Sequence, residues 1–223
     1  MTNTTTTKRR GRPNPLELEN FQRIFQAEDS EKILLSLVNA YHRYNERTSR
    51  RYDSIIKLDS TDVKIPSIHF KAQAQGARDH KNIELHVLKE EHLAGGFNDY
   101  WGKIMTDTIK GVDDYSVSDR VEKIYLVDYD LFDKKREYET IFNLNKSSNG
   151  NNILGGGVTL VFYELAKFKK MTEKQIRAEW TTREPFLKWL VFLSPSSNPQ
   201  LLKEAILLDE DIKEAEERLH KSY

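Results

Sequence analysis

The sequence contains no cysteine, and this absence excludes several kinds of chemistry at once. Disulfide bridges, cysteine-ligated zinc sites and thiol nucleophiles all require a residue that the chain does not have. Long apolar runs are absent too, so we expect neither a membrane span nor a signal segment after the N-terminus. We therefore expect a soluble intracellular protein, in the cytoplasm or associated with a nucleus or nucleoid, without contact with a membrane.

The chain also has no net charge, because 35 basic residues balance 35 acidic ones. Any affinity for nucleic acid must then come from local patches of charge. Such a patch lies near the start of the chain, at Lys8, Arg9, Arg10 and Arg12. The remaining composition is typical of a folded protein: 223 residues, with 38% hydrophobic and 31% charged side chains, suit one large domain with its own core.

Two short runs with strand-like alternation lie on either side of a loop that contains Gly76 and Asp79, and together they predict a β-hairpin. The runs are IHFKAQ (residues 68–73) and NIELHV (residues 82–87). Successive side chains of a strand point to opposite faces. One face of the hairpin is therefore apolar, with Ile68, Phe70, Ala72, Ile83, Leu85 and Val87. The other face collects His69, Lys71, Gln73, Asn82, Glu84 and His86.

The polar face of this hairpin has two interpretations. A carboxylate, two imidazoles and a lysine on neighbouring strands can bind a metal ion or carry out acid–base chemistry. The same residues can also be the solvated side of an ordinary half-buried hairpin. Alternation alone does not decide between them, so the choice depends on the rest of the chain.

The rest of the chain predicts an α/β domain. Further strands are expected at residues 121–129, 138–144 and 158–165. Apolar residues at helical spacing predict helices at 18–25, 33–41 and 97–108, one that starts with a capping box at Thr172, another over 186–192, and a last one over 200–219. Residues 1–15 lack an apolar period and are expected to be a disordered basic tail, followed by the domain at 16–223.

Six short motifs, the first two of which consist of two segments each, occur together in one known family. They are FQRIF with ILLSLVNA (21–25 and 33–40), IHFKA with NIELH (68–72 and 82–86), DYWGK (99–103), IYLVDYDLF (124–132), VFYELAKF (161–168) and LKWLVFL (187–193). In this order they resemble the PD-(D/E)xK nuclease family transposases, the recombination-promoting nucleases. The resemblance covers roughly residues 18–219 and implies a restriction-endonuclease-like fold, a mixed β-sheet flanked by helices.

The resemblance also implies a metal-dependent DNA endonuclease, with Mg²⁺ or Mn²⁺ as cofactor and DNA as partner. Family enzymes carry an aspartate on the first strand of the hairpin, a glutamate on the second, and a glutamine two residues later. Glu84 keeps its place here, but His69 stands at the aspartate position and His86 at the glutamine position. These three residues are the implied metal ligands, and Lys71 joins them as a candidate catalytic residue that steadies a phosphate or a water.

The two substitutions leave three interpretations open. Mg²⁺ prefers carboxylate oxygens, whereas imidazole nitrogens suit Mn²⁺, Zn²⁺, Co²⁺ or Ni²⁺. The site has lost its metal and its activity, or it is tuned for a softer metal, or it uses Mg²⁺ slowly with help from a carboxylate such as Glu31 or Asp79. In the first case the protein is an inactive module that binds DNA or another protein.

The basic tail adds a separate indication of DNA binding. Its core, Arg9-Arg10-Gly11-Arg12-Pro13, resembles an AT-hook. Such a core lies extended in the narrow minor groove of A·T-rich DNA, where the negative potential attracts arginine. The alternative is a basic tail that binds DNA through charge alone, without sequence preference.

Overall fold

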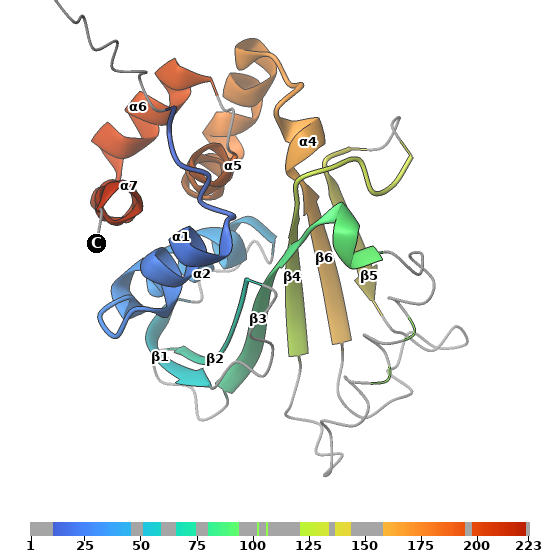
Figure 1. The fold of residues 1–223 in the computed structure, drawn as a ribbon, viewed down its shortest axis with the longest axis vertical. Helices are drawn as coiled ribbons and strands as arrows, with labels where there is room; N and C mark the ends of the chain where they lie inside the picture. The colour runs from blue at the N-terminus through green and yellow to red at the C-terminus, as the bar shows by residue number, and fades with distance from the viewer. Residues whose placement is uncertain are drawn as a thin grey trace, which may run out of the picture.

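A computed structural model describes residues 11–45, 51–58, 66–74, 80–93, 102, 106, 121–133, 137–143, 158–194 and 198–221. It confirms the predicted α/β architecture, a mixed sheet flanked by helices (Figure 1). The six strands are β1 (Tyr52–Leu58), β2 (Ser67–Ala74), β3 (His80–Leu88), β4 (Val121–Val127), β5 (Glu139–Asn143) and β6 (Val158–Glu164). They lie side by side in the order β1-β2-β3-β4-β6-β5.

The strand directions explain the sequence patterns. β1, β2 and β3 form an antiparallel meander, β4 runs parallel to both β3 and β6, and β5 is antiparallel to β6. Parallel strands in the middle of a sheet are buried on both faces and therefore read as nearly continuous apolar runs. β4 and β6 have such runs and lie inside the sheet, as predicted.

The two faces of the sheet bury different groups of residues. On one face, Phe70, Leu85 and Leu126 join the main core, which also contains the buried faces of α2 (Glu31–Asn45) and α5 (Glu173–Leu193). The other face carries a smaller apolar group around Tyr125, Leu160 and Phe162. Because side chains alternate along a strand, the polar residues of the β2–β3 hairpin share this second face.

The remaining helical elements are short. They are α1 (Leu18–Phe21), the π-helical turn η1 (Gln22–Gln26), the 3-10 turn η2 (Glu90–Leu93), α4 (Leu165–Phe168), α6 (Pro199–Leu208) and α7 (Glu210–His220). Among the described residues, no helix combines the length and the apolar character that crossing a membrane requires. The helix predicted at 97–108 lies, apart from Gly102 and Thr106, outside the described residues.

Two predicted helix boundaries are wrong. The helices expected from Thr172 and over 186–192 form one helix, α5, with Pro185 inside it. A proline in a helix removes a backbone hydrogen bond, but complete burial of Trp189 and Phe192 stabilises the continuous helix. The helix expected over 200–219 is instead divided at Asp209, whose carboxylate accepts the backbone N–H groups of Asp211 and Ile212 and so caps α7.

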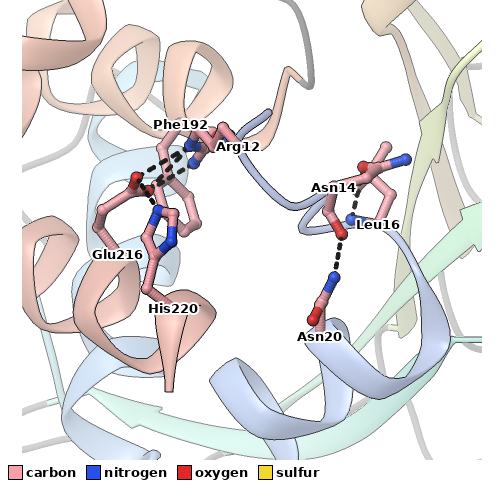
Figure 2. Close-up of polar contacts among 7 residues, drawn as sticks. All are labelled: Arg12, Asn14, Leu16, Asn20, Phe192, Glu216 and His220. Carbon is pink, nitrogen blue, oxygen red and sulfur yellow. Dashed lines mark hydrogen bonds and ion pairs between the residues drawn. The ribbon is translucent and has the colours of Figure 1, made fainter. Parts of the chain in front are cut away.

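Residues 12–15 are packed against the domain, although we expected a disordered tail over 1–15. The Arg12 guanidinium donates two hydrogen bonds of 3.0 and 2.7 Å to Glu216 on α7 and one of 2.9 Å to the Phe192 carbonyl of α5. It also lies 5.0 Å from the centroid of the Phe192 ring, within cation–π range. Figure 2 shows this group, with His220 on the same carboxylate. Residues 1–10 lie outside the described residues, and disorder there stays a prediction.

Replacing Arg12 with alanine is expected to lower the free energy of unfolding by about 2–4 kcal/mol, because the side chain is 15% exposed and its loss leaves a largely buried carboxylate without its guanidinium. Urea denaturation measures the loss. Arg177→Ala is a matched control, since Arg177 pairs with Glu173 and Glu204 at the surface and should cost much less. Equal losses in the two variants would contradict an anchoring role for Arg12.

Candidate metal centre

Three residues of the β2–β3 hairpin converge on one face of the sheet. His69 on β2 lies directly opposite Glu84 on β3, and His86 follows Glu84 by two residues on the same strand. The Glu84 Oε2 atom is 2.9 Å from His86 Nε2 and 3.8 Å from His69 Nε2. One donor atom from each residue can be chosen so that all three lie within 4.8 Å of one another. The alternation read from the sequence therefore predicts this cluster correctly.

A lysine that the sequence did not reveal completes the cluster. β4 pairs in parallel with β3 and sets Lys123 beside Glu84, with its Nζ 2.9 Å from Glu84 Oε2. Lys123 is only 8% exposed, so this ion pair is shielded from water. The available signal was its charged side chain, which with Glu122 interrupts the otherwise apolar strand VEKIYLV.

Tyr125, two residues further along β4, forms the floor of the site. Its ring stacks on His86 with centroids 5.1 Å apart and an angle of 17° between the planes. The Tyr125 ring also stacks against the ring of Phe162 on β6, with centroids 4.7 Å apart. The imidazole of His86 is thus held between an aromatic ring and a carboxylate, which fixes its orientation toward Glu84.

Lys71, the lysine predicted from the sequence, occupies a different place. It lies on the same face of β2 but is paired with Asn82, one step along the hairpin from the His69–Glu84 pair. Within the described part of the chain it makes no ion pair with Glu84, whereas Lys123 does. Lys123 is therefore the lysine in contact with the candidate ligands.

The electrostatics of the site favour an ionised Glu84 carboxylate beside a neutral His69 imidazole. Burial alone would raise the pKa of Glu84, but the hydrogen bond from His86 and the charges around it lower this pKa to about 2. Burial lowers the pKa of His69, against the opposing pull of the Glu84 charge. A deprotonated imidazole nitrogen has a free lone pair, so His69 is suited to metal ligation at neutral pH.

Two nitrogen donors and one carboxylate form a donor set that suits a divalent transition metal better than Mg²⁺. Their side chains are 23%, 18% and 16% exposed for His69, Glu84 and His86, so a bound ion would still be reachable by a substrate. The residues present therefore fit a divalent ion of the Mn²⁺ or Zn²⁺ type. Lys123 already occupies one carboxylate oxygen and would compete with such an ion.

The other predicted residues that the structure describes are not brought to this cluster. Arg12 binds Glu216, and Gly11 and Pro13 flank it in the chain, while Arg9 and Arg10 lie outside the described residues. Glu31, one of the two carboxylates that we considered as helpers, does not join it either. Glu31 begins α2, which packs on the opposite face of the sheet, and Asp79 lies outside the described residues.

A comparison with known protein families gives a match over most of the chain. The sequence model for the PD-(D/E)XK nuclease family transposases matches residues 20–222, almost the whole chain. No curated protein and no solved structure matches it. The mixed sheet with its flanking helices is consistent with the restriction-endonuclease-like fold of such nucleases. The motifs, the sheet and the matched sequence model agree, and the chain belongs to the PD-(D/E)XK nuclease family transposases.

Proposed function

We propose that this protein is an intracellular DNA endonuclease that uses a divalent transition metal held by His69, Glu84 and His86. The observation that carries the proposal is the convergence of one carboxylate and two imidazoles within 4.8 Å on the polar face of the hairpin. A divalent ion bound there would polarise a phosphodiester and lower the pKa of a water molecule. Nitrogen ligands favour Mn²⁺, Zn²⁺, Co²⁺ or Ni²⁺ over Mg²⁺.

The protein's own residues would contribute positioning and charge. Glu84 stays ionised and supplies the negative charge of the site, and the stacked Tyr125 ring keeps His86 in place. The ammonium of Lys123, beside the same carboxylate, is placed to attract the phosphate of a bound DNA strand. Lys71, on the same face, is a second candidate for a phosphate contact.

Cleavage of supercoiled plasmid DNA in Mn²⁺, Mg²⁺ or no metal tests the proposal directly. We expect cleavage in Mn²⁺, little in Mg²⁺ and none without metal. Glu84→Gln removes the only carboxylate of the cluster and should lower activity by about 100-fold, the scale of losing a group that organises a metal site. Glu90→Gln, which neutralises an exposed carboxylate on η2, is the matched control. Equal cleavage by the two variants would contradict the proposal.

A second candidate function is an inactive DNA-binding module on the same fold. The observation that favours it is the Lys123–Glu84 ion pair, which neutralises the carboxylate without any metal. Such a module would bind DNA with a strong salt dependence but cleave it in none of the metals. The plasmid assay together with a DNA-binding titration separates the two functions.

Replacing Lys123 with methionine is expected to tighten Mn²⁺ binding by roughly tenfold, or about 1.4 kcal/mol, because it frees a carboxylate oxygen and removes a like charge beside the metal. Isothermal titration calorimetry measures this affinity. Lys71→Met removes the same charge from the Lys71–Asn82 pair, which neighbours the His69–Glu84 pair on this face. It should change the Mn²⁺ affinity much less. Weaker binding in Lys123→Met, or equal changes in both variants, would contradict competition between Lys123 and the metal.

Only part of the basic segment near the N-terminus is included in the proposal. We infer that Lys8, Arg9 and Arg10 add to DNA affinity through charge. Arg12 is excluded from this set because its guanidinium is engaged by Glu216 and Phe192. An AT-hook needs that arginine in the minor groove, so its release from the domain would have to precede groove binding.

A further inference from the structure

A large cleft lies on the other side of the sheet from the metal centre. It has a volume of about 800 Å³ and opens between α2, the start of β1, α5 and the junction of α6 and α7. α2 and α5 belong to the core on the face that contains Phe70 and Leu85, whereas Glu84 points to the opposite face. The cleft is therefore separate from the candidate metal centre, and its size is typical of a small-molecule site.

One wall of the cleft brings two arginines together. Asn39 on α2 acts as a pairing partner for the first residue of β1: it accepts the Tyr52 N–H at 2.8 Å and donates to the Tyr52 carbonyl at 3.0 Å. The Tyr52 side chain is buried and its ring lies 4.8 Å from that of His42. Arg43 is one helical turn beyond Asn39, and Arg51 directly precedes Tyr52, so this fixed wall carries both guanidinium groups.

The charge balance of the cleft is positive. Four cations line it, Lys32, Arg43, Arg51 and Lys188, against the three acids Asp53, Asp209 and Asp211. Two of the acids are already engaged: Asp211 pairs with Lys32 at 2.9 Å, and Asp209 caps α7. In the described part of the chain, neither Arg43 nor Arg51 has an ion pair. Among the acids that line the cleft, Asp53 is the one left to oppose the two guanidinium groups, and the largely buried Lys188 of α5 lies beside them.

We propose that this cleft binds a phosphate ester through Arg43 and Arg51. The planar fork of a guanidinium matches the oxygens of a phosphate and forms paired, charge-assisted hydrogen bonds. Leu35, Ala40 and Pro185 add apolar surface beside the cations, which suits the organic part of the ligand. The ligand comes from one of two sources, a free nucleotide or the backbone of bound DNA. The DNA source rests on the function proposed above, whereas the nucleotide source is independent of it.

Binding of AMP and of a short fluorescein-labelled DNA duplex, both without divalent metal, tests the site. Arg43→Gln and Arg51→Gln should each lower the affinity for the probe that binds in the cleft by about tenfold, the scale of losing charge-assisted hydrogen bonds. Lys174→Gln, an exposed cation near the start of α5, is the control for charge alone. Asp53→Asn should act in the opposite direction and tighten binding, because it removes the opposing acid.

The outcomes separate the sources. Weaker AMP binding in both arginine variants assigns the cleft to a nucleotide, and weaker duplex binding alone assigns it to the DNA backbone. If the arginine variants lose no more affinity than Lys174→Gln for either probe, the proposal is overturned. Glu84→Gln should leave binding of AMP to the cleft unchanged, since Glu84 lies on the other face of the sheet. Failure of the metal centre to cleave DNA is thus distinguishable from failure of this site.

Discussion

Replacing His69 with aspartate is expected to shift the metal preference of the site from Mn²⁺ toward Mg²⁺ and to raise Mg²⁺-dependent DNA cleavage by about 100-fold, within the range that one well-placed charged group contributes to catalysis. His69 lies opposite Glu84 across the hairpin, with their nearest donor atoms 3.8 Å apart. An aspartate there would give the ion two carboxylates from adjacent strands. Mg²⁺ is a hard cation that prefers such oxygen ligands.

A second carboxylate so close to Glu84 would be unfavourable without compensation, since two like charges at this distance repel. The structure supplies the compensation in Lys123, at 2.9 Å from Glu84, and in His86 on the same oxygen. We therefore expect the variant to fold and to bind the ion more tightly than the wild type.

His69→Asn is the matched control for this substitution. It has the shape of aspartate but no charge, and it should give no gain with Mg²⁺. Calorimetric titration with Mg²⁺ and Mn²⁺ measures the preference, and plasmid cleavage measures activity. If the aspartate and asparagine variants behave alike, His69 is not at a metal-ligand position, or the site has lost activity elsewhere.

The part of the site that could be predicted from the sequence is the part encoded by local alternation. Period-two patterning sets His69 and Glu84 on one face of a hairpin whose two strands are close in the chain. The neighbouring residues Lys123 and Tyr125 come from β4. This strand pairs in parallel with β3, and a long crossover connection separates the two strands in the chain. Local patterns do not contain the register of such a parallel pair, so these two residues were missed.

The same limit applies to Arg12. A polar, proline-containing segment without apolar period predicts disorder, and nothing near it in the sequence indicates a partner. Its partner Glu216 is 204 residues away on α7. A run of acidic residues such as that of α7 is typical of a solvated helix face, which holds for the exposed Glu210 but not for Glu216, whose side chain is 16% exposed. Long-range ion pairs of this kind follow from the tertiary fold alone.

The largest loss of stability is expected at Glu164, where β6 ends. This carboxylate is fully buried and accepts the backbone N–H groups of Leu131 and Phe132 at 2.7 and 3.1 Å. Its other oxygen binds the Lys167 ammonium at 2.8 Å, which in turn donates to the Asp133 carbonyl at 2.9 Å. The pair thus fastens the segment after β4 to the end of β6, and it gives a structural reason for the motif VFYELAKF.

Glu164→Leu is expected to lower the free energy of unfolding by about 3–5 kcal/mol, because it leaves a buried ammonium without its counter-charge and two backbone donors without an acceptor. Lys167→Met should cost a comparable amount, since it leaves the carboxylate without its counter-charge. Guanidinium denaturation followed by tryptophan fluorescence measures both. Lys170→Met provides the control: its ion pair with Asp130 is exposed on the lysine side, and its loss should cost about 0–1 kcal/mol.

The double variant Glu164→Leu with Lys167→Met distinguishes a buried ion pair from two independent contacts. Removing both partners eliminates the unpaired charge that makes each single substitution costly, so the double variant should lose clearly less than the sum of the two single losses. The unsatisfied N–H groups of Leu131 and Phe132 should keep it below wild-type stability. Additive losses would mean that the two side chains act separately, and that the ion pair does not fasten the end of β6.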